Sequence, residues 1–331
     1  MLSVTYFYRE PRKTGVSIEG IFRSVKACLN GKVDIKEFYC NPGLSRIRNT
    51  LRAAKFSGEI NHITGDVNFL ALGLKGKKNI LTIHDFGFYE NPAHSKLVIF
   101  IYRFFWFYLP FKFVDRVTVV SDFTKQKLIQ HFNFPEDRIR VIPDPVKPIF
   151  RYVKQEKPDA RPVILMIGSG KHKNLDNLIE AARDTGFHLD IIGWPAPDEM
   201  EKLKKYSISY TIYNNLSDEE VNERYIACDV LFIASLYEGF GMPIIEAQAV
   251  GRPVVTSNIG AMKELGEGSA VLVDPHKPEE IRAAISSLMD KQLYDETVSR
   301  GRINAAKYDC EKIASQYLEV YQELALLLGS P

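Results

Sequence analysis

Short apolar runs rich in β-branched residues alternate with amphipathic stretches along the whole chain. In the first half this pattern predicts strands over 3–8, 32–39, 58–64, 78–84, 116–121 and 138–142. In the second half it predicts strands over 162–168, 188–193, 208–213, 230–235, 253–257 and 270–273. The runs are continuously apolar, which is typical of parallel strands buried on both faces, and helical patterns separate them. The pattern therefore predicts an α/β protein made of doubly wound, Rossmann-like parallel sheets.

Length and proline content divide this pattern into two domains. A chain of 331 residues is too long for one ordinary core, and residues 142–162 carry five prolines without any periodicity, as a linker does. We expect a first domain over 1–150 and a second over 151–305. The end of the chain reads as one helix over 303–327, and the segment 306–331 is a candidate to pack back on the first domain. Ligands of open α/β sheets bind beyond the carboxyl ends of the strands, so two such domains are expected to bind a ligand between them.

The net charge of +2 hides an asymmetry between the two halves. Residues 1–150 hold 23 Lys and Arg against 13 Asp and Glu, a net charge of +10, whereas residues 151–331 hold 20 against 28, a net charge of −8. A basic first domain suggests an anionic partner such as a phosphate-bearing substrate, a membrane surface or nucleic acid. Nucleic acid is not favoured, because no recognition helix or RNA-binding motif accompanies the charge.

Several classes of site have no support in the sequence. The four cysteines have neither metal-ligand spacing nor the density of a disulfide scaffold, and they read as buried thiols in a reducing cytoplasm. The first residues lack the apolar stretch and cleavage site of a signal peptide, so a cytoplasmic protein is expected. No Asp-x-Asp motif and no metal-spaced His, Cys and Asp cluster occurs, so neither a metal nor another cofactor is expected.

Candidate chemistry concentrates in residues 235–257, SLYEGFGMPIIEAQAVGRPVVTS. A predicted strand ends in a loop that carries Glu238, and a proline then suits the first position of a helix. Gly239 and Gly241 allow a ligand to approach the backbone closely, and the helix N-terminus adds a partial positive charge. A carboxylate accepts two hydrogen bonds at once, so Glu246, expected in the first turn of the helix, can hold the vicinal hydroxyls of a ribose. The stretch therefore predicts a site for phosphate and sugar hydroxyls.

With seven residues between Glu238 and Glu246, this stretch resembles the signature of the retaining family 4 glycosyltransferases of the GT-B fold. Other segments similar to family motifs are VILMIGSGKHKNLDNLIEAA, LSDEEVNERYIACDVLFIASLYEGFG, LTIHDF and VDRVTVVSDFTKQKL, and NHITGDVNFL is similar to a segment of one bacterial subset. The similarity covers most of the chain. It implies two Rossmann-like domains facing a central cleft, and transfer of a sugar from a nucleotide diphosphate sugar to an acceptor hydroxyl with retention of configuration. The setting it implies is polysaccharide, lipopolysaccharide or glycolipid assembly.

The resemblance also implies a role for each matching residue. Glu246 would hold the ribose, Lys173 would bind the diphosphate, and Leu216 would line the base pocket. Many members have an arginine where this chain has Ser169, and Lys171 is the candidate to replace its charge. The implied donor-binding set is Gly15, Gly168, Ser169, Lys171, Lys173, Leu216, Glu238, Gly239, Phe240, Gly241, Met242 and Glu246.

In the first domain, His84 and Asp85 end a predicted strand, where a side chain can point toward a ligand. The family's matching histidine contacts the sugar in transfer, so the implied catalytic residues are His84, Glu238 and Lys173. His62 and Asp66, with Thr64 between them, are candidates for the acceptor side. Each of these residues can also have a role that involves no ligand. A histidine can be structural, a lysine can be a solvated surface charge, and an acid can stabilise a turn.

Residues 97–113, LVIFIYRFFWFYLPFKF, contain nine aromatic residues and only Arg103 and Lys112 as charges. The run is too short and too interrupted to cross a bilayer, for which about 20 apolar residues are needed. Two interpretations stay open: a helix buried against the first sheet, or a helix that lies on an anionic membrane, since aromatic rings favour the headgroup boundary. The second would suit a lipid-linked acceptor and an enzyme peripheral to the inner face of the cytoplasmic membrane.

Two other functions fit the same architecture. A nucleotide-sugar epimerase would need no acceptor and would convert the donor into a second nucleotide sugar. A non-catalytic nucleotide-sugar binding subunit would keep the pocket without turnover. The presence of Glu238, Glu246 and Lys173 together argues against a site that has lost its catalytic residues.

Overall fold

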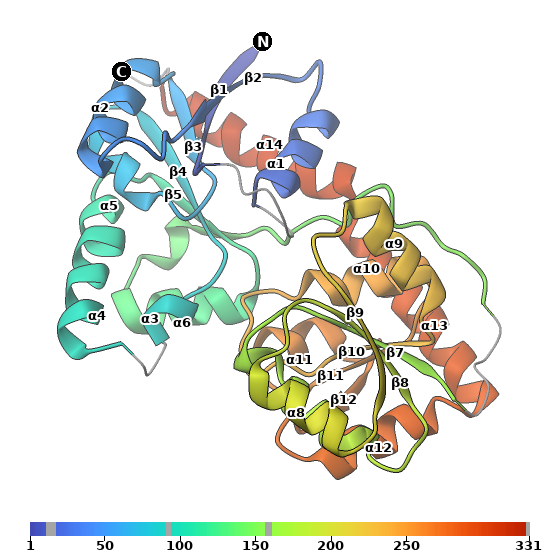
Figure 1. The fold of residues 1–331 in the computed structure, drawn as a ribbon. Helices are drawn as coiled ribbons and strands as arrows, with labels where there is room; N and C mark the ends of the chain where they lie inside the picture. Colours follow the sequence, from blue (N-terminus) through green and yellow to red (C-terminus); the bar gives the residue numbers. More distant parts are fainter. Residues whose placement is uncertain (11–17, 91–93, 156–160, 329–331) are drawn as a thin grey trace. The chain divides into compact units, whose positions relative to one another are not determined.

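A computed structural model describes residues 1–10, 18–90, 94–155 and 161–328, which form two compact units (Figure 1). Unit 1 comprises Met1–Pro145 together with Cys310–Pro331, and unit 2 comprises Val146–Asp309. Each unit is built around a six-stranded sheet in which every pair of neighbouring strands is parallel.

The strands follow the predicted pattern in both units. Unit 1 has the order β2-β1-β3-β4-β5-β6, with β1 Leu2–Tyr8, β2 Val33–Tyr39, β3 Ile60–Ile63, β4 Lys78–Ile83, β5 Arg116–Val119 and β6 Ile139–Val141. Unit 2 has the order β12-β11-β10-β7-β8-β9, with β7 Val163–Ile167, β8 His188–Ile192, β9 Ser209–Tyr213, β10 Val230–Ile233, β11 Val254–Ser257 and β12 Val271–Val273. All twelve predicted strands are present, and the doubly wound α/β fold is confirmed.

Helices connect the strands and cover the sheets. In unit 1 they are α1 Ile18–Cys28, α2 Arg46–Phe56, η1 Asn68–Gly73, α3 Gly87–Glu90, α4 Lys96–Tyr102, the π-helix η2 Arg103–Tyr108, α5 Leu109–Phe111, α6 Asp122–Phe132, η3 Glu136–Arg138 and α14 Cys310–Leu326. In unit 2 they are η4 Lys171–Lys173, α7 Leu175–Ala182, α8 Pro197–Lys205, α9 Asp218–Ala227, α10 Met242–Val250, α11 Gly260–Gly266, α12 Pro278–Ser287, α13 Lys291–Ala305 and η5 Ala306–Tyr308.

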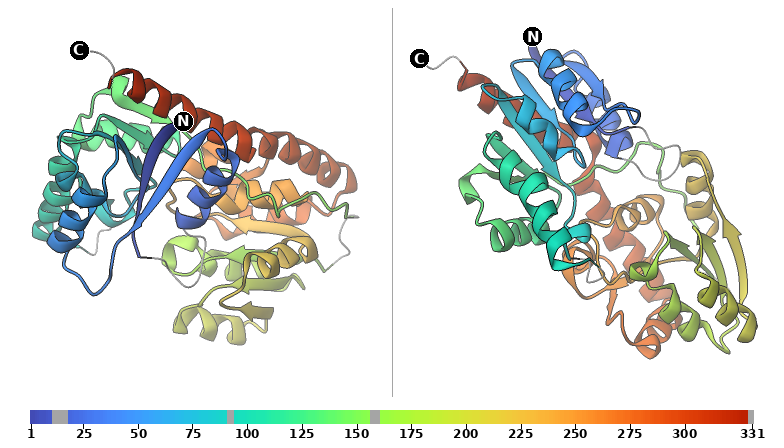
Figure 2. Two further views of the ribbon diagram at one scale, coloured as in Figure 1. Left: turned by 90° about the horizontal axis from the view of Figure 1, so that it is seen from above. Right: turned by 60° about the vertical axis from the view of Figure 1, so that its left-hand side comes forward.

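Both faces of the unit 1 sheet are buried, which explains why its strands are continuously apolar. On one face Tyr6 of β1 packs with Phe22 of α1 and with apolar residues of α14. On the other face Phe7 packs with residues of α2, η1 and α6. Successive side chains of β1 therefore belong to two different cores, as the pleat of a strand requires. Figure 2 shows α14, in dark red, lying along this sheet.

The sheet of unit 2 is covered in the same way. The residues of α7, α8 and α12 that face the sheet join those of β7, β8 and β10 in one core. On the other face α10 packs against β10 and α13. These two layers hold the strands rigidly, so that the loops at their carboxyl ends start from fixed positions.

The single helix expected over 303–327 is wrong. The chain ends α13 at Ala305, passes through η5, and leaves the helical region at Asp309, where φ is −58° and ψ is 137°. Aspartate is a favoured residue immediately before a helix, and α14 begins at the next residue. The apolar face expected on this last segment is buried, and it consists of Ile313, Tyr317, Val320, Tyr321 and Leu324. The break separates a helix of unit 2 from a helix of unit 1.

Polar groups join α14 to the sheet of unit 1. The hydroxyl of Tyr321 donates to the hydroxyl of Tyr6 at 2.9 Å and lies 2.8 Å from Nδ1 of His62. The other ring nitrogen of His62 lies 2.7 Å from Oγ1 of Thr82. Burial lowers the pKa of His62 to about 3, so its ring is neutral. His62 is fully buried and both of its nitrogens have partners, which favours a structural role, and its place on the acceptor side stays a prediction.

We predict that Tyr321→Phe lowers the free energy of unfolding by about 1–3 kcal/mol, because it leaves Nδ1 of the buried His62 without a partner. Chemical denaturation followed by circular dichroism measures the change. Tyr108→Phe, which removes an exposed hydroxyl of the same unit, is the matched control and should change the stability by less than about 0.5 kcal/mol. Equal effects of the two substitutions would contradict the assignment of this network.

Candidate functional site

The candidate donor site of unit 2 lies where its strand order reverses. From β7 the chain runs outward to β8 and β9, and from β10 it runs in the opposite direction to β11 and β12. The loops that follow β7 and β10 therefore diverge from neighbouring strands, and such a switch point is where open α/β sheets bind ligands. The two loops, 168–174 and 234–241, carry most of the residues that the sequence singled out.

Lys173 and Glu238 form an ion pair between these two loops. Their side chains are only 18% and 19% exposed, and the hydroxyl of Ser235 also donates to Oε1 of Glu238 at 3.0 Å. Gly168 makes the position of Lys173 possible, because its φ is +118° and an added Cβ would lie 2.6 Å from Cε of the lysine. Three residues that the sequence predicted separately are thus brought together.

Two further contacts fix one loop against the other. The side chain of Asn174, which has a φ of +66°, donates to the carbonyls of Ala234 at 2.9 Å and Pro275 at 2.7 Å. The amide of Leu236 donates to the carbonyl of His172 at 2.8 Å. Asn174 is not among the residues that the sequence predicted, although asparagine adopts the left-handed conformation more readily than most residues.

The other residues of the loop after β7 have different partners. The Oγ of Ser169 accepts the amide hydrogen of Trp194 at 2.7 Å, which ties this loop to the one after β8. The ammonium of Lys171 lies 2.7 Å from a carboxylate oxygen of Asp176 and 2.5 Å from one of Asp198. Burial lowers the pKa of Lys171, but these hydrogen bonds outweigh it and raise the pKa. Acids thus already neutralise the charge of Lys171, and its replacement of the missing arginine stays a prediction.

Glu246 is buried in α10 with one carboxylate oxygen unsatisfied. Its side chain is 1% exposed, Oε2 accepts a hydrogen bond from the hydroxyl of Tyr225 at 2.9 Å, and Oε1 has no protein partner. Burial raises the pKa of Glu246 to about 7, against the lowering effects of the charge of Lys147 and of the Tyr225 hydroxyl. The residue is the fifth of α10 rather than part of its first turn. A buried acceptor of this kind is suited to a ligand that brings hydroxyl donors.

The sequence analysis missed Lys147 and Tyr225 beside Glu246. Lys147 is buried in the linker region, and its ammonium lies 2.6 Å from Oδ1 of Asp218 at the start of α9. A lysine among prolines and a tyrosine inside a helix carry no local signal for a shared site, because only the fold brings them to α10.

The end of the loop before α10 is closely packed. Gly241 has a φ of +112°, and an added Cβ would lie 2.2 Å from Cε of Met262. Phe240 is buried with its ring edge-on to Tyr308, and Met242 is buried too. Gly239 lies in the same loop, and Leu216 is half-buried in the loop after β9. All four residues of Gly239–Met242 are thus buried, and contact of their peptide groups with a ligand stays a prediction.

In unit 1 the corresponding switch point lies between β1 and β3, and His84 follows the adjacent strand β4. Nε2 of His84 lies 2.9 Å from the carbonyl oxygen of Thr64, and Nδ1 lies 3.7 Å from Oδ2 of the buried Asp144. Burial lowers the pKa of His84, but the charge of Asp144 and the Thr64 carbonyl outweigh it and raise the pKa to about 9. His84 is thus an imidazolium at neutral pH, with both N–H groups directed at oxygen atoms.

Two further candidates of unit 1 have polar partners within the unit. Asp66, which has a φ of +58°, pairs with Arg9 at 2.5 Å. Oδ1 of the exposed Asp85 accepts the amide hydrogen of Gly87 at 2.7 Å. Gly15 lies outside the described residues.

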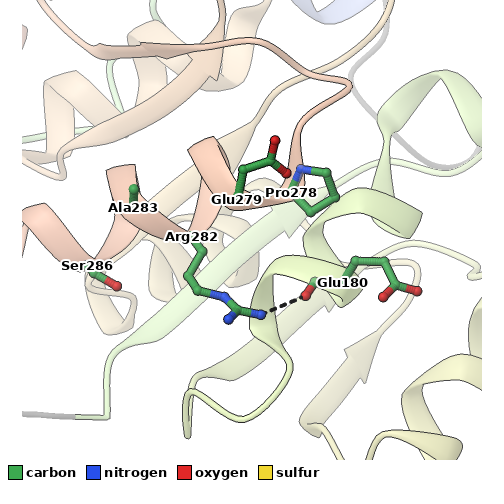
Figure 3. A pocket seen from close by; sticks show the side chains of 6 residues that line it. All are labelled: Glu180, Pro278, Glu279, Arg282, Ala283 and Ser286. Carbon is green, nitrogen blue, oxygen red and sulfur yellow. Dashed lines mark hydrogen bonds between the residues drawn. The ribbon is translucent and has the colours of Figure 1, made fainter.

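Other kinds of site receive little support from the described part of the chain. Among residues 1–10, 18–90, 94–155 and 161–328, no group of three or more His, Cys, Asp and Glu side chains could hold a metal ion. Figure 3 shows a pocket between α7 and α12, where Nη2 of Arg282 donates to the backbone carbonyl of Glu180 at 3.2 Å. Nε of Arg282 donates to the carbonyl of Ala181 at 2.8 Å, so this guanidinium serves to join the two helices.

Known proteins resemble this chain over both units. A sequence model described as Glycosyl transferases group 1 matches residues 151–308, and one described as Glycosyltransferase Family 4 matches residues 39–148. The O-antigen chain mannosyltransferase B of Escherichia coli is 27% identical over 63% of this chain and 60% of its own length. The MMP alpha-(1->4)-mannosyltransferase of Mycolicibacterium hassiacum is 26% identical over 63% of this chain and 54% of its own length. The matches thus span less than two thirds of these relatives.

Solved structures share the fold at low sequence identity. Anabaena Alr3699/HepE in complex with UDP and glucose has a TM-score of 0.80 at 14% identity, covering 96% of this chain and 99% of its own. WaaG, a glycosyltransferase involved in lipopolysaccharide biosynthesis, has a TM-score of 0.71 at 14% identity, covering 97% and 99%. The chain thus combines two doubly wound units with matches to two glycosyltransferase sequence models, which cover residues 39–148 and 151–308. The chain belongs to the family 4, group 1 glycosyltransferases and has their GT-B fold.

Proposed function

We propose that this protein is a retaining glycosyltransferase that moves a hexose from a nucleotide diphosphate sugar to an acceptor hydroxyl. The observation that carries the proposal is the buried carboxylate of Glu246, whose unsatisfied Oε1 lies in the helix that follows the Lys173–Glu238 loop pair. A ribose supplies the paired hydroxyl donors that such a carboxylate lacks. The mannosyltransferase relatives support a hexose as the transferred sugar.

The diphosphate would bind to Lys173 and to the N-terminus of α10. An ammonium has three donors, so Lys173 can keep its bond to Glu238 and still donate to phosphate oxygens. The helix dipole favours an anion at the same end of α10. This positive charge would stabilise the leaving group without a metal ion, which is why we propose a metal-independent reaction.

The sugar would lie beside Glu238 and the backbone of Gly239–Met242. In the proposed step the bond between the anomeric carbon and the diphosphate oxygen breaks, and the acceptor oxygen bonds to the same face of that carbon. The proton of the acceptor hydroxyl passes to the leaving phosphate. His84, whose two N–H groups already face Thr64 and Asp144, would act on the sugar in transfer through its positive charge rather than accept a proton.

We further propose that the acceptor is a sugar or a lipid-linked sugar, and that the enzyme works in the cytoplasm at the inner face of the cytoplasmic membrane. Relatives named for O-antigen and lipopolysaccharide synthesis and the net charge of +10 in residues 1–150 support this location. No helix among the described residues is long and apolar enough to cross a membrane, so the association would be peripheral.

The direct test is a panel of UDP-, GDP- and ADP-linked glucose and mannose, scored for thermal stabilisation and for release of the nucleoside diphosphate. A ligand at 100 times its Kd should stabilise the folded protein by about 2.7 kcal/mol. We expect one donor to stabilise the protein and to be consumed. Absence of any stabilisation would contradict the proposal. Conversion into a second nucleotide sugar would indicate an epimerase, and stabilisation without turnover would indicate a binding subunit.

We predict that Lys173→Ala lowers kcat by about 100-fold or more, because one preorganised donor to a developing charge contributes about 3–4 kcal/mol. Nucleoside diphosphate release measures the rate. The control is Lys171→Ala in the same loop, which removes an ammonium that acids already neutralise and should lower kcat by less than about threefold. Similar losses in both variants, or no loss in either, would remove Lys173 from the site.

We predict that donor affinity rises with pH between pH 6 and 8, because the ionised carboxylate of Glu246 accepts the ribose hydroxyls and its pKa is about 7. Below that pKa the affinity should fall about tenfold per pH unit. The charged and titratable groups that act on Glu246 are Lys147, Tyr225 and Asp218.

Calorimetric titration with an intact nucleotide sugar measures this dependence, because the sugar ester lacks the terminal phosphate that titrates near pH 6 in a free nucleotide. Glu246→Gln should bind more weakly at pH 8 and show no such pH dependence. A pH profile that Glu246→Gln leaves unchanged would disprove the assignment.

A further inference from the structure

An aromatic surface lies on α4 and η2, on the side of these helices that faces away from the sheet of unit 1. No residue of α4 is buried, and Leu97 and Phe100 are 68% and 66% exposed. The rings of Phe104 and Phe105 lie 5.1 Å apart, and those of Phe104 and Tyr108 lie 5.7 Å apart, so the exposed rings form one patch. The large apolar side chains exposed on this run are Leu97, Val98, Phe100, Ile101, Phe104, Phe105 and Tyr108.

The opposite side of the same run belongs to the core. Phe107 is buried, and Tyr102 and Trp106 pack against the cluster that contains residues of α2, η1 and α6. The interpretation as a buried helix therefore holds for one side of the run, which joins it to the domain. The other side is in contact with solvent, and its contact with a membrane stays a prediction. Single exposed apolar residues are common on protein surfaces, whereas a contiguous set of this size marks a contact surface.

Helix α2 extends this surface and adds charge. It is linked to η2 through η1, and the guanidinium of Arg46 lies 4.7 Å from the ring centre of Trp106. Ile47 and Leu51 are exposed on α2. Figure 1 shows α2, α5 and α4 along one side of unit 1. Residues 45–58 and 95–114 contain seven Lys and Arg and no Asp or Glu, and all seven are exposed: Arg46, Arg48, Arg52, Lys55, Lys96, Arg103 and Lys112.

We propose that α2 and α4–η2 form a docking surface that lies flat on an anionic lipid headgroup layer. The inference names the partner surface for the membrane location proposed above, and it does not depend on the donor site. Aromatic rings prefer the boundary between headgroups and acyl chains, and the surrounding Lys and Arg side chains pair with lipid phosphates.

The charge of the surface decides among its potential partners. A second copy of the chain would bring seven further positive charges against the first seven across a symmetric contact, and repulsion would oppose it. Nucleic acid would match the charge, but the aliphatic side chains of Ile47, Leu51, Leu97 and Ile101 offer nothing to a base or a phosphate. Anionic lipid satisfies both the apolar and the basic part.

The surface also begins next to the candidate acceptor side. The chain leaves His84 at the carboxyl end of β4 and enters α4 after α3. Phe88 of α3 is exposed, and its ring lies 4.2 Å from that of Tyr102 in α4. A lipid-linked acceptor held in the membrane would thus have its headgroup close to the strand end that carries His84.

The test is sedimentation of the full chain with vesicles of equal parts phosphatidylglycerol and phosphatidylcholine, compared with vesicles of phosphatidylcholine alone. We expect binding to the anionic vesicles that weakens when the salt rises from 0.05 to 0.5 M, since the Debye length then falls from about 14 Å to about 4 Å. Phe100→Ser with Phe105→Ser, and separately Arg48→Glu with Lys55→Glu, should each reduce the bound fraction about tenfold or more.

Matched controls lie on unit 2. Lys204→Glu with Lys205→Glu makes the same change of net charge on exposed residues of α8, and Ile303→Ser removes an exposed apolar residue of α13. Both should keep wild-type vesicle binding. The proposal is overturned if the wild type does not bind anionic vesicles, or if the controls lose binding as the surface variants do. Surface variants that turn a dimer into a monomer in analytical ultracentrifugation without changing vesicle binding would also overturn it.

Stabilisation by nucleotide sugars, measured without lipid, separates this inference from the proposed function. The surface variants should keep it, because they change no residue of unit 2. A wild type that is stabilised by a nucleotide sugar but does not bind anionic vesicles would refute the docking surface alone, and a wild type that binds the vesicles but is stabilised by no nucleotide sugar would refute the donor assignment alone.

Discussion

Parallel strands can be joined only by a connection that crosses a face of the sheet, and this constraint governs both units of the protein. Because helices then cover both faces, nearly every strand position is apolar, and polar side chains gather in the loops at the strand ends. The strand order reverses once in each sheet, so the loops after β7 and β10 in unit 2 diverge, as do those after β1 and β3 in unit 1. Lys173, Glu238 and His84 all follow strands at or beside these points.

A second constraint acts on the charges that the fold buries. A carboxylate without partners is costly in an apolar environment, and an unsatisfied oxygen costs about 1–3 kcal/mol. Among the described residues of unit 2, only Tyr225 donates a hydrogen bond to the Glu246 carboxylate, and Lys147 acts on it through its charge. In contrast, the ammonium of Lys171 is paired with several acids, which neutralise its charge. The incomplete set of partners around Glu246 is what a ligand would complete.

The sequence was sufficient for the strands and for the loop residues, and it failed where distant segments decide the outcome. Buried parallel strands leave continuous apolar runs, so all twelve could be read directly. Nothing in the local sequence shows which of Lys171 and Lys173 pairs with Glu238, because the pairing depends on Asp198 of α8 and on Glu238 of the loop after β10. The break at Asp309 could not be predicted for the same reason. An aspartate also fits the polar side of a continuous helix, and it is the packing of α14 in unit 1 that requires the chain to leave the helix at this residue.

The charges also bear on which group accepts the proton of the acceptor in the proposed reaction. Glu238 already accepts hydrogen bonds from Lys173 and Ser235, and His84 holds two protons at neutral pH, so neither is suited to act as a base. The leaving phosphate is the remaining candidate, since it gains negative charge as its bond to the sugar breaks. Full neutralisation by a lysine would make that phosphate a weak base. Because Lys173 shares its charge with Glu238, it can stabilise the departing diphosphate while leaving the phosphate oxygen basic enough to take the proton.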